Sequence, residues 1–563
     1  MDHSAGGSSQ RSGAPVTRTL YRGSGQNHRG FQPGPIVNTV AVTRNGTKTS
    51  TGIRSLATLD ETEMTVIESS QDLGLRGFSG ASRAAQFVQL QRRRNVSGET
   101  AGGQIAIFPK RREGKSRSSC AGSFASQKTR EHAMRIILAA TPATGHLDPV
   151  LGIAHLLRRH GHETLVLTGS AFRERVQATG AGFAALPPDG DCLCDIGTGL
   201  ADHTRLGRGA ALAAELDRAF VKPMVGQFRA LASLIDSYRP DGVIADHLFL
   251  GAVPLMLSPP ATRPFVASCG VTFLGLPRED GLPHGFGLSS AQDPAARAAE
   301  QALVTPQTEA AFGSVQARFV STLQAIGVKP RGSFLDVAAQ HADIFWQGGL
   351  PELDYPRANL PTHIRHIGLW PAVPQRVELP DWAERLADGR RLILVTQGTV
   401  ANGDLEQLLL PTLRALAHRN DLIVIGATGG RDPTGIIVPD NARLAANLPL
   451  DWVLPHVHAL VSNGGFGTVL LALACGVPMV IAGESEDKRE IAARIASSGA
   501  GLDLRTARPN QADISAGVEA LLEANSPHRR AAHAIANGFA RCHGDAIILE
   551  SLEEHRLGMS RAA

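Results

Sequence analysis

The sequence predicts an α/β protein with two Rossmann-like halves that face each other across a cleft. Three observations support this fold class. The chain has 563 residues, too many for a single hydrophobic core. Short apolar runs alternate with amphipathic helical patterns in two separate stretches, as in doubly wound parallel sheets. Between these stretches lies a proline-containing segment with the composition of an interdomain linker.

These patterns divide the chain into five parts. We expect a mostly disordered basic extension (1–133), a first half (134–367), a linker (368–385), a second half (386–545) and a C-terminal helix with a tail (546–563). The extension has 19 Lys and Arg against 9 Asp and Glu, whereas the remainder has 37 against 43. The basic excess is therefore confined to the extension, and nothing in the globular part indicates a nucleic-acid surface.

Overall composition favours a soluble protein. Hydrophobic residues make up 43% and charged residues 19% of the chain, which is ordinary for globular proteins. The sequence shows neither an apolar run of the roughly 18–20 residues needed to span a bilayer nor an apolar signal segment. Its six cysteines lack paired CxxC spacing, which favours reduced thiols in a cytoplasmic protein over a zinc site.

In the first half, an apolar strand (134–140) leads through a loop (141–146) to an amphipathic helix that starts at Asp148-Pro149. The later elements follow the same alternation, and residues 270–310 are predicted to form irregular loops over the strand ends. The later strands are predicted at 163–168, 183–186, 242–246, 264–268 and 343–347, and the later helices at 171–179, within 210–238, and at 308–326.

The second half repeats the pattern and then becomes mainly helical from about residue 512. Strands are predicted at 391–396, 422–426, 459–462 and 477–482, and helices at 403–419, up to Cys475, and around 492–498. Two such halves joined by a linker imply a cleft between them, which is the usual place for a ligand.

A glycine-rich turn follows the strand at 459–462. It reads Asn463-Gly464-Gly465-Phe466-Gly467-Thr468 and leads directly into a helix. Glycines between a strand and a helix let the backbone approach a phosphate, and the free N–H groups of the first helical turn then face that anion. A tight βα turn with no ligand is the alternative interpretation, because a single glycine cluster has low specificity.

Four segments, in this order, carry a resemblance to a known family. They are ATGHLDPVLGIAHLLRRHGHETLVLTG, IADHLFLGAVP, ILVTQGTVAN, and the run from NLPLDWVLPHVHALVSNGGFGTVLL to SGAGLDL. Together, over roughly residues 134–551, they resemble the family 1 glycosyltransferases of the UDP-glycosyltransferase superfamily. The similarity is greatest to the bacterial and fungal branch that acts on macrolides, polyketides and other lipophilic molecules. The resemblance implies the GT-B fold.

The resemblance also implies a catalytic pair. His146 would be the general base that takes a proton from the acceptor hydroxyl, and Asp246 would orient it and stabilise its charged form. Both roles are chemically reasonable, because a hydroxyl is a poor nucleophile until deprotonated and histidine titrates near neutrality. Without the family context, His146 would be interpreted as an ordinary histidine at a helix start. Asp241 is expected to be a turn residue.

The same comparison implies a set of donor-binding residues. Two positions depart from the family pattern: Asn463 stands where many relatives have histidine, and Lys488 where they have glutamine. These departures leave the strength of diphosphate binding and the identity of the sugar open. The implied donor-binding residues are Thr396, Gln397, Gly398, Thr399, Asn447, Asn463, Gly464, Gly465, Gly467, Thr468, Asp487 and Lys488.

No metal and no cofactor are expected, since the nucleotide sugar is a co-substrate. The run Asp189-Gly190-Asp191 has the form of a metal-binding DxD motif, but it lies in a Pro- and Gly-containing loop and is interpreted as a surface turn. In a GT-B enzyme, backbone N–H groups and a helix terminus can stabilise the leaving diphosphate.

The resulting hypothesis is an inverting, metal-independent transfer of a hexose from a UDP- or dTDP-sugar to a hydroxyl of a small lipophilic acceptor. The expected partners are therefore the nucleotide-sugar donor and that acceptor, without nucleic acid. A nucleotide-sugar epimerase on the same fold and a non-catalytic sugar-nucleotide-binding protein are the alternatives. The hypothesis requires that His146 and the amides after Asn463 face each other across a gap.

Overall fold

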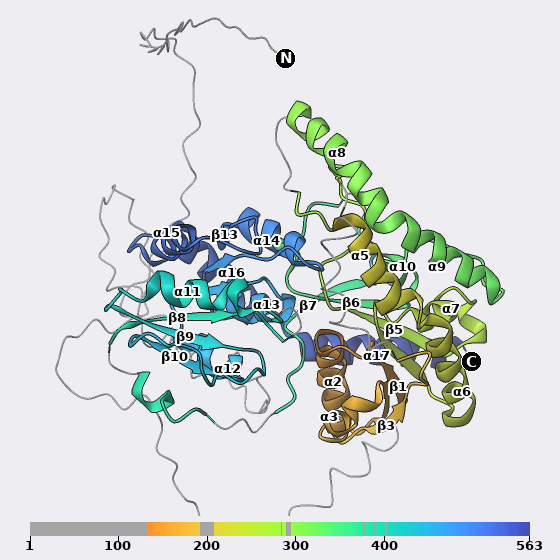
Figure 1. Cartoon of the computed structure of the whole chain (residues 1–563). Helices are drawn as coiled ribbons and strands as arrows, with labels where there is room; N and C mark the ends of the chain where they lie inside the picture. The colour runs from red at the N-terminus through yellow and green to blue at the C-terminus, as the bar shows by residue number, and fades with distance from the viewer. Residues whose placement is uncertain are drawn as a thin grey trace, which may run out of the picture. The chain divides into compact units, whose positions relative to one another are not determined.

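The computed structural model describes residues 133–191, 208–282, 284–288, 294–357, 359–374, 379–386, 389–399 and 402–562. The predicted disordered extension therefore lies outside the described residues, apart from residue 133. The described chain contains two parallel sheets with helices packed against them (Figure 1).

The first sheet has seven parallel strands in the order β3-β2-β1-β4-β5-β6-β7. Every strand of this half predicted from the sequence is present. Strand β7 was not predicted, and it ends at Gly368, the first residue of the predicted linker. The strands are β1 (Arg135–Ala139), β2 (Glu163–Thr168), β3 (Gly182–Ala185), β4 (Gly242–Asp246), β5 (Phe265–Gly270), β6 (Ile344–Gly348) and β7 (Ile364–Gly368).

Alternating side chains of β1 enter different cores, which explains why this strand is apolar throughout. Ile136 and Leu138 pack with the cluster that contains α2 (Thr144–Arg159). Ile137 and Ala139 pack on the opposite face with α6 (Met224–Tyr238). The other helices of this half are α3 (Arg173–Gln177), α5 (Arg208–Leu216), α7 (Val253–Met256), α8 (Pro294–Thr308), α9 (Ser314–Ala325) and α10 (Val337–His341).

Three helix predictions in the first half need correction. Helix α2 begins at Thr144, so His146 lies in its first turn and not in a loop; Pro149 is accommodated inside the helix rather than marking its start. The long helix predicted within 210–238 is broken by a π turn (Asp217–Val221) ahead of Pro223, which cannot donate to a helical hydrogen bond. Residues 270–310 are not all irregular, because their alanine-rich end forms α8.

The second sheet has six parallel strands in the order β10-β9-β8-β11-β12-β13. The short strands β10 and β13 were not predicted, and the helix predicted at 403–419 is limited to α11. The elements are β8 (Arg391–Thr396), α11 (Leu409–Leu416), β9 (Leu422–Ala427), β10 (Ala442–Ala445), α12 (Leu450–Val453), β11 (Ala459–Ser462), α13 (Phe466–Ala474), β12 (Met479–Ile481), α14 (Lys488–Ser497), β13 (Gly501–Asp503), α15 (Gln511–Leu522) and α16 (Pro527–Arg541).

The two halves share a packed boundary. Phe273, which follows β5, and Phe466 at the start of α13 meet edge to face with ring centroids 5.0 Å apart. Leu350 and Leu353, which follow β6, belong to the same buried cluster as the second sheet and α13. The start of α13 is therefore held against the first half.

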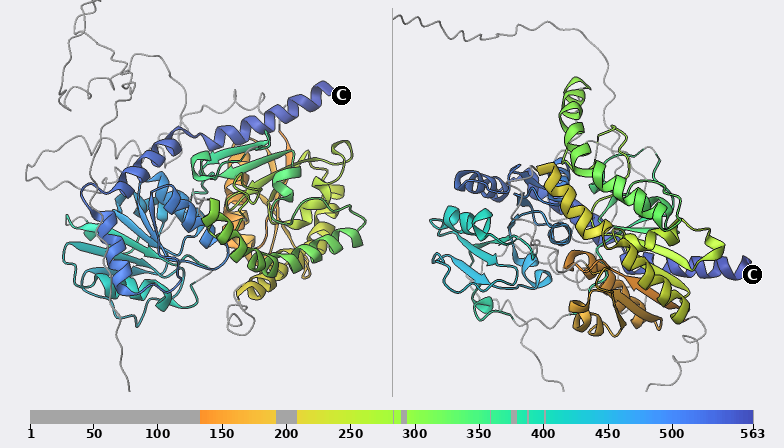
Figure 2. Two further views of the ribbon diagram at one scale, coloured as in Figure 1. Left: turned by 90° about the horizontal axis from the view of Figure 1, so that it is seen from above. Right: turned by 45° about the vertical axis from the view of Figure 1, so that its right-hand side comes forward.

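The C-terminal helix α17 (Gly544–Ala562) returns to the first half, where it packs beside β7 (Figure 2). Ile548 and Leu552 are 0% and 2% exposed and join the cluster of β1 and α2. The indole Nε1 of Trp346 donates to Ser551 Oγ at 3.4 Å. The end of the chain thus completes the core of the first half.

Replacing Leu552 by alanine is expected to lower the free energy of unfolding by about 2–5 kcal/mol, because the substitution leaves a cavity in this core. Leu557 on the same helix is 45% exposed, so Leu557→Ala is the matched control and should change stability by less than about 0.5 kcal/mol. Denaturant unfolding measures both. Equal effects of the two substitutions would contradict the docking of α17.

Candidate active site

In both sheets, strand order reverses next to the first strand of the half. The reversal lies between β1 and β4 in the first sheet and between β8 and β11 in the second. The carboxyl ends of the strands at such reversal points are where α/β proteins commonly bind ligands, because chain crossovers leave these points in opposite directions. The predicted site residues lie at or just after the ends of these four strands and of β12, except Asn447, which follows β10.

At the first reversal, His146 and Asp246 form a hydrogen-bonded pair. His146 lies in the first turn of α2, immediately after β1, and Asp246 is the last residue of β4. His146 Nδ1 is 2.9 Å from Asp246 Oδ1. The fully buried carboxylate also accepts from the backbone N–H groups of Thr141 (2.6 Å) and Leu248 (3.0 Å), so its position is fixed from three sides.

The environment of His146 favours its protonated form. Burial alone would lower the pKa of His146, but the charge and hydrogen bond of Asp246 outweigh it, so that the pKa is raised above its ordinary value. Asp487 and Glu486 of the second half add to this increase. Phe220, in the π turn before α6, packs against the histidine. The centroids of the two rings are 5.4 Å apart.

At the second reversal, the glycine turn opens α13. Gly464 has φ of +90°, and a Cβ there would lie 2.9 Å from Ile481 Cγ2, so only glycine fits. In contrast, a Cβ on Gly465 or Gly467 would meet no atom of another part of the chain within 4 Å. No side chain caps this helix, and the Val469 N–H donates to the Gly465 carbonyl at 3.0 Å. The amides of Phe466, Gly467 and Thr468 therefore point out of the helix end.

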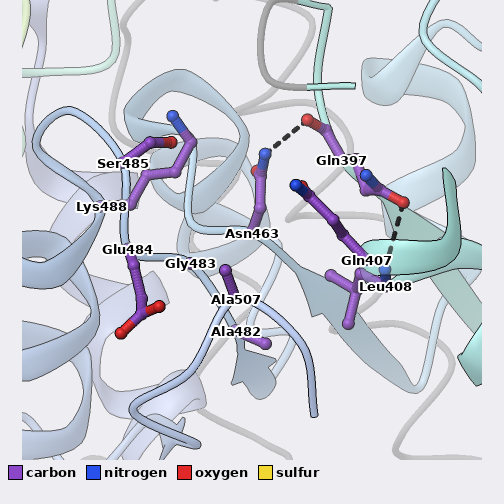
Figure 3. Close-up of a pocket in the computed structure, with 10 residues that line it drawn as sticks. All are labelled: Gln397, Gln407, Leu408, Asn463, Ala482, Gly483, Glu484, Ser485, Lys488 and Ala507. Atoms are coloured by element: carbon purple, nitrogen blue, oxygen red, sulfur yellow. Dashed lines mark hydrogen bonds between the residues drawn. The ribbon is translucent and has the colours of Figure 1, made fainter. Parts of the chain in front are cut away.

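The turns after β8 and β11 are joined through Asn463. Its Nδ2 donates to the backbone carbonyl of Gln397 (Figure 3). The side chain of Gln397 is bonded to a different element, α11. Its Oε1 accepts from the N–H groups of Leu408 (3.3 Å) and Leu409 (2.8 Å) and so anchors the start of that helix. The Gln397 side chain is thus engaged within the protein, and its backbone is the part joined to Asn463.

A small pocket of about 240 Å³, including its open mouth, lies beside this junction. Figure 3 shows the side chains of Asn463, Gln407 and Lys488 around it. Sequence reasoning missed several of its residues, although the polar run after the β12 strand was a usable signal. The lining residues are Gln397, Gln407, Leu408, Asn463, Ala482, Gly483, Glu484, Ser485, Lys488 and Ala507.

The turn between β12 and α14 connects this pocket with the first half. Lys488 is buried, and its Nζ pairs with Glu486. Burial raises the pKa of the neighbouring Asp487 carboxyl, while Lys488 and the nearby Thr272 of the first half act in the opposite direction. Because Asp487 also acts on His146, it lies in electrostatic reach of groups from both halves.

Of the other predicted donor-binding residues, Thr396 is buried, whereas Thr399 and Asn447 lie at the surface. Thr396 ends β8, and its hydroxyl accepts from the Gly398 N–H at 3.2 Å. Asn447 follows β10 and lies near Gly430, and neither it nor Thr399 is among the residues that line the pocket in the described part of the chain.

In the Asp189-Gly190-Asp191 turn, Gly190 is buried and the two aspartates are at least partly exposed. Asp189 is exposed and pairs with Arg229, and Asp191 accepts from the Ser170 N–H at 3.3 Å. Within the described ranges, no group of three or more His, Cys, Asp or Glu side chains is arranged to hold a metal ion. None of the helices in those ranges is long and apolar enough to cross a membrane.

Comparison with known proteins identifies the family. The profile described as "Erythromycin biosynthesis protein CIII-like, C-terminal domain" matches residues 411–553. The 4'-demethylrebeccamycin synthase of Lentzea aerocolonigenes is 32% identical over 406 residues, which cover 69% of this chain and 92% of that protein. UDP-glucosyltransferase A1 of Starmerella bombicola is 31% identical over 435 residues, covering 75% and 92% respectively. The chain belongs to the UDP-glycosyltransferase family.

Solved structures show that this glycosyltransferase has the GT-B fold. The glycosyltransferase of kitacinnamycin matches with a TM-score of 0.56 at 20% identity, over 75% of this chain and 98% of that one. The calicheamicin glycosyltransferase CalG4 matches with a TM-score of 0.55, also at 20% identity and with the same coverage. The family, the fold and the enzyme class predicted from the sequence are thereby confirmed.

Proposed function

We propose that this glycosyltransferase moves a hexose from a UDP- or dTDP-sugar to a hydroxyl of a small lipophilic acceptor such as a polyketide, a macrolide or a phenol. The relatives named above support the substrate classes: one is a UDP-glucosyltransferase and one is a 4'-demethylrebeccamycin synthase. The observation that carries the proposal is the His146–Asp246 pair, which lies in electrostatic reach of the turn that begins α14.

His146 is the general base in this proposal. With Nδ1–H donated to Asp246, the neutral imidazole keeps Nε2 as an acceptor for the proton of the attacking hydroxyl. Asp246 holds this tautomer and stabilises the imidazolium that forms. As the acceptor oxygen bonds to the anomeric carbon, the bond from that carbon to the diphosphate breaks.

The open end of α13 supports metal-independent departure of the diphosphate. The amides of Phe466, Gly467 and Thr468 and the positive end of the helix dipole stabilise the growing negative charge. Asp487 and Lys488 would contact the sugar hydroxyls. In this scheme the acceptor, activated from the first half, attacks the anomeric carbon on the face opposite the diphosphate held by the second half, which gives inversion.

Asn463 has a positional role in this scheme. Its bond to the Gln397 carbonyl fixes the two phosphate-facing turns to each other. The charge that histidine would supply at this position is absent, so the backbone amides carry most of the phosphate binding. We also propose a cytoplasmic location, because Cys269, Cys475 and Cys542 are free thiols in the described structure.

The test is to incubate the full chain with UDP- and dTDP-sugars and a library of hydroxylated natural products. A mass increase of one hexose in an acceptor, an anomeric configuration opposite to that of the donor, and unchanged activity after chelation of divalent cations would support the proposal. A changed donor sugar without glycoside would favour an epimerase. Donor binding without transfer to any acceptor would favour a non-catalytic binding protein.

A further inference from the structure

Glu490 joins the two halves next to the proposed donor site. It lies on α14, less than one turn after Asp487 and Lys488, and it is fully buried. Its Oε2 accepts from the backbone N–H groups of Gly285 (3.0 Å) and Gly287 (3.3 Å). Both glycines belong to the first half, about 200 residues earlier in the chain, so one carboxylate binds a segment of the opposite half through its backbone.

The first-half segment fits α14 only because of its glycines. Gly285 and Gly287 have φ of +94° and +66°, which other residues rarely adopt. A Cβ on Gly287 would lie 2.4 Å from the backbone carbonyl oxygen of Arg489. We call residues 284–288 the seated segment, because it rests directly on the backbone of α14.

Arg494 and His284 flank the Glu490 carboxylate. Arg494 on the same helix lies 3.1 Å from Oε1, and His284 of the seated segment lies 3.6 Å from Oε1. Burial lowers the pKa of His284 to about 4, so it is neutral near pH 7. Burial would raise the pKa of Glu490, but the charge of Arg494 and the hydrogen bond from the Gly285 amide lower it overall, which keeps the carboxylate ionised.

Arg494 extends the contact further into the first half. It pairs with Asp354. Its guanidinium carbon also lies 4.5 Å from the ring centroid of Phe273 and 4.3 Å from that of Tyr355. The guanidinium carbon of Arg278 lies 3.6 Å from the ring centroid of Tyr355. Arg278 also donates to the carbonyl of Leu288, at the end of the seated segment, at 2.6 Å. The seated segment is therefore held at both ends by one buried network.

From this geometry we propose that Glu490 is a positioning residue that keeps the seated segment closed over the reaction centre. The inference rests on the proposed function. Thr272, at the start of the loop that leads to this segment, already lies near Asp487. A carboxylate on the donor helix that binds this loop would thus set the acceptor's position and exclude water from the donor.

The chemical consequence is a choice between two nucleophiles. The acceptor hydroxyl gives the glycoside, the nucleoside diphosphate and a proton, whereas water gives the free sugar, the same diphosphate and a proton. The same anomeric bond to the diphosphate breaks in both reactions. The seated segment favours the first reaction because it orders the acceptor and closes off water.

The test is the isosteric variant Glu490→Gln in the full chain, with UDP-glucose or another accepted donor. We expect kcat/KM for the acceptor to fall about 10- to 100-fold, since small misplacements near a reacting centre have effects of this size. The ratio of donor hydrolysis to transfer should rise, while UDP affinity stays within about 2-fold of the parent, because the phosphate turn is separate. Glu490→Asp, which keeps the charge, should recover part of the transfer.

Asp343→Asn is the matched control. Asp343 is a partly buried carboxylate that accepts from Arg263 (2.6 and 2.9 Å) and from the Val266 N–H (2.8 Å), all within the first half. It should lower the melting temperature without changing the hydrolysis-to-transfer ratio. Hydrogen exchange of the amides of 284–288 should accelerate in Glu490→Gln and not in Asp343→Asn.

The outcomes separate this inference from the proposed function. If the parent forms no glycoside, the proposed function fails and the inference fails with it. If the parent is active and the Glu490→Gln ratio and exchange rates equal those of the parent, the inference alone is overturned. If Glu490→Gln does not fold, as judged by circular dichroism, Glu490→Asp decides by the same ratio.

Discussion

Replacing His146 by alanine should reduce kcat for sugar transfer by about 10²- to 10⁴-fold, the contribution of a positioned general base. Affinity for UDP or dTDP should stay close to that of the parent. The reason is the division of the site: His146 lies at the reversal of the first sheet, whereas the open end of α13 lies at that of the second. Steady-state kinetics and calorimetric nucleotide titration measure the two quantities.

His160→Ala is the matched control for this prediction. His160 caps the opposite end of the same helix, where its Nδ1 bonds to the Leu156 carbonyl at 2.9 Å. Its removal tests for a general effect on α2 and should leave kcat within a few-fold of the parent. Comparable activity of His146→Ala and the parent would remove His146 from the mechanism.

The pH profile gives a second measure of the same residue. A base must be deprotonated to act, so kcat/KM should fall as the pH drops through the pKa of His146. That pKa is raised above its ordinary value by Asp246, with Asp487 and Glu486 contributing. In Asp246→Asn the main raising charge is lost, so the acidic limb should move to lower pH while kcat itself decreases, because the imidazole tautomer is no longer fixed.

The sequence predicted the apolar central strands and the short edge strand β3, but it missed β7, β10 and β13, whose patterns are short or mixed. The runs at 391–396 and 422–427 are nearly all apolar, as a central parallel strand requires. The strands at 442–445 and 501–503 have four and three residues, and each includes a charged side chain. Their place at the two edges of the sheet is a tertiary property that no local pattern records.

The candidate site shows the same limit. The family motifs indicated His146 and Asp246, and the structure places them 2.9 Å apart although 100 residues separate them. The motifs also indicated Gln397 as a donor ligand, but they contain no sign that its side chain anchors α11. The bond of Glu490 to the Gly285 amide spans 205 residues and depends on how the halves pack. Local patterns identify such residues only after the fold is known.

Replacing Gly467 by alanine should weaken binding of the nucleoside diphosphate by about 10- to 100-fold while leaving the protein at least as stable as the parent. Gly467 is exposed in the first turn of α13, and no atom lies within 4 Å of a built Cβ, so the fold accommodates alanine. Alanine is also the better helix former by about 0.5–1 kcal/mol.

The loss of affinity follows from the direction of the added methyl group. In an α-helix the Cα–Cβ bond tilts toward the N-terminus, so the methyl projects into the space where an anion would meet the free amides. A lost hydrogen bond to a charged group costs about 1.5–3 kcal/mol, which corresponds to the stated range in affinity. Titration calorimetry with UDP and thermal unfolding measure the two effects separately.

Gly464→Ala is the contrasting variant. Its φ of +90° and the contact with Ile481 make alanine strained there, so this variant should lose stability as well as affinity. Gly467→Ala should lose affinity alone. If Gly467→Ala binds UDP as tightly as the parent does, the amides of α13 do not face the diphosphate, and the glycine turn is a tight connection between a strand and a helix with no ligand.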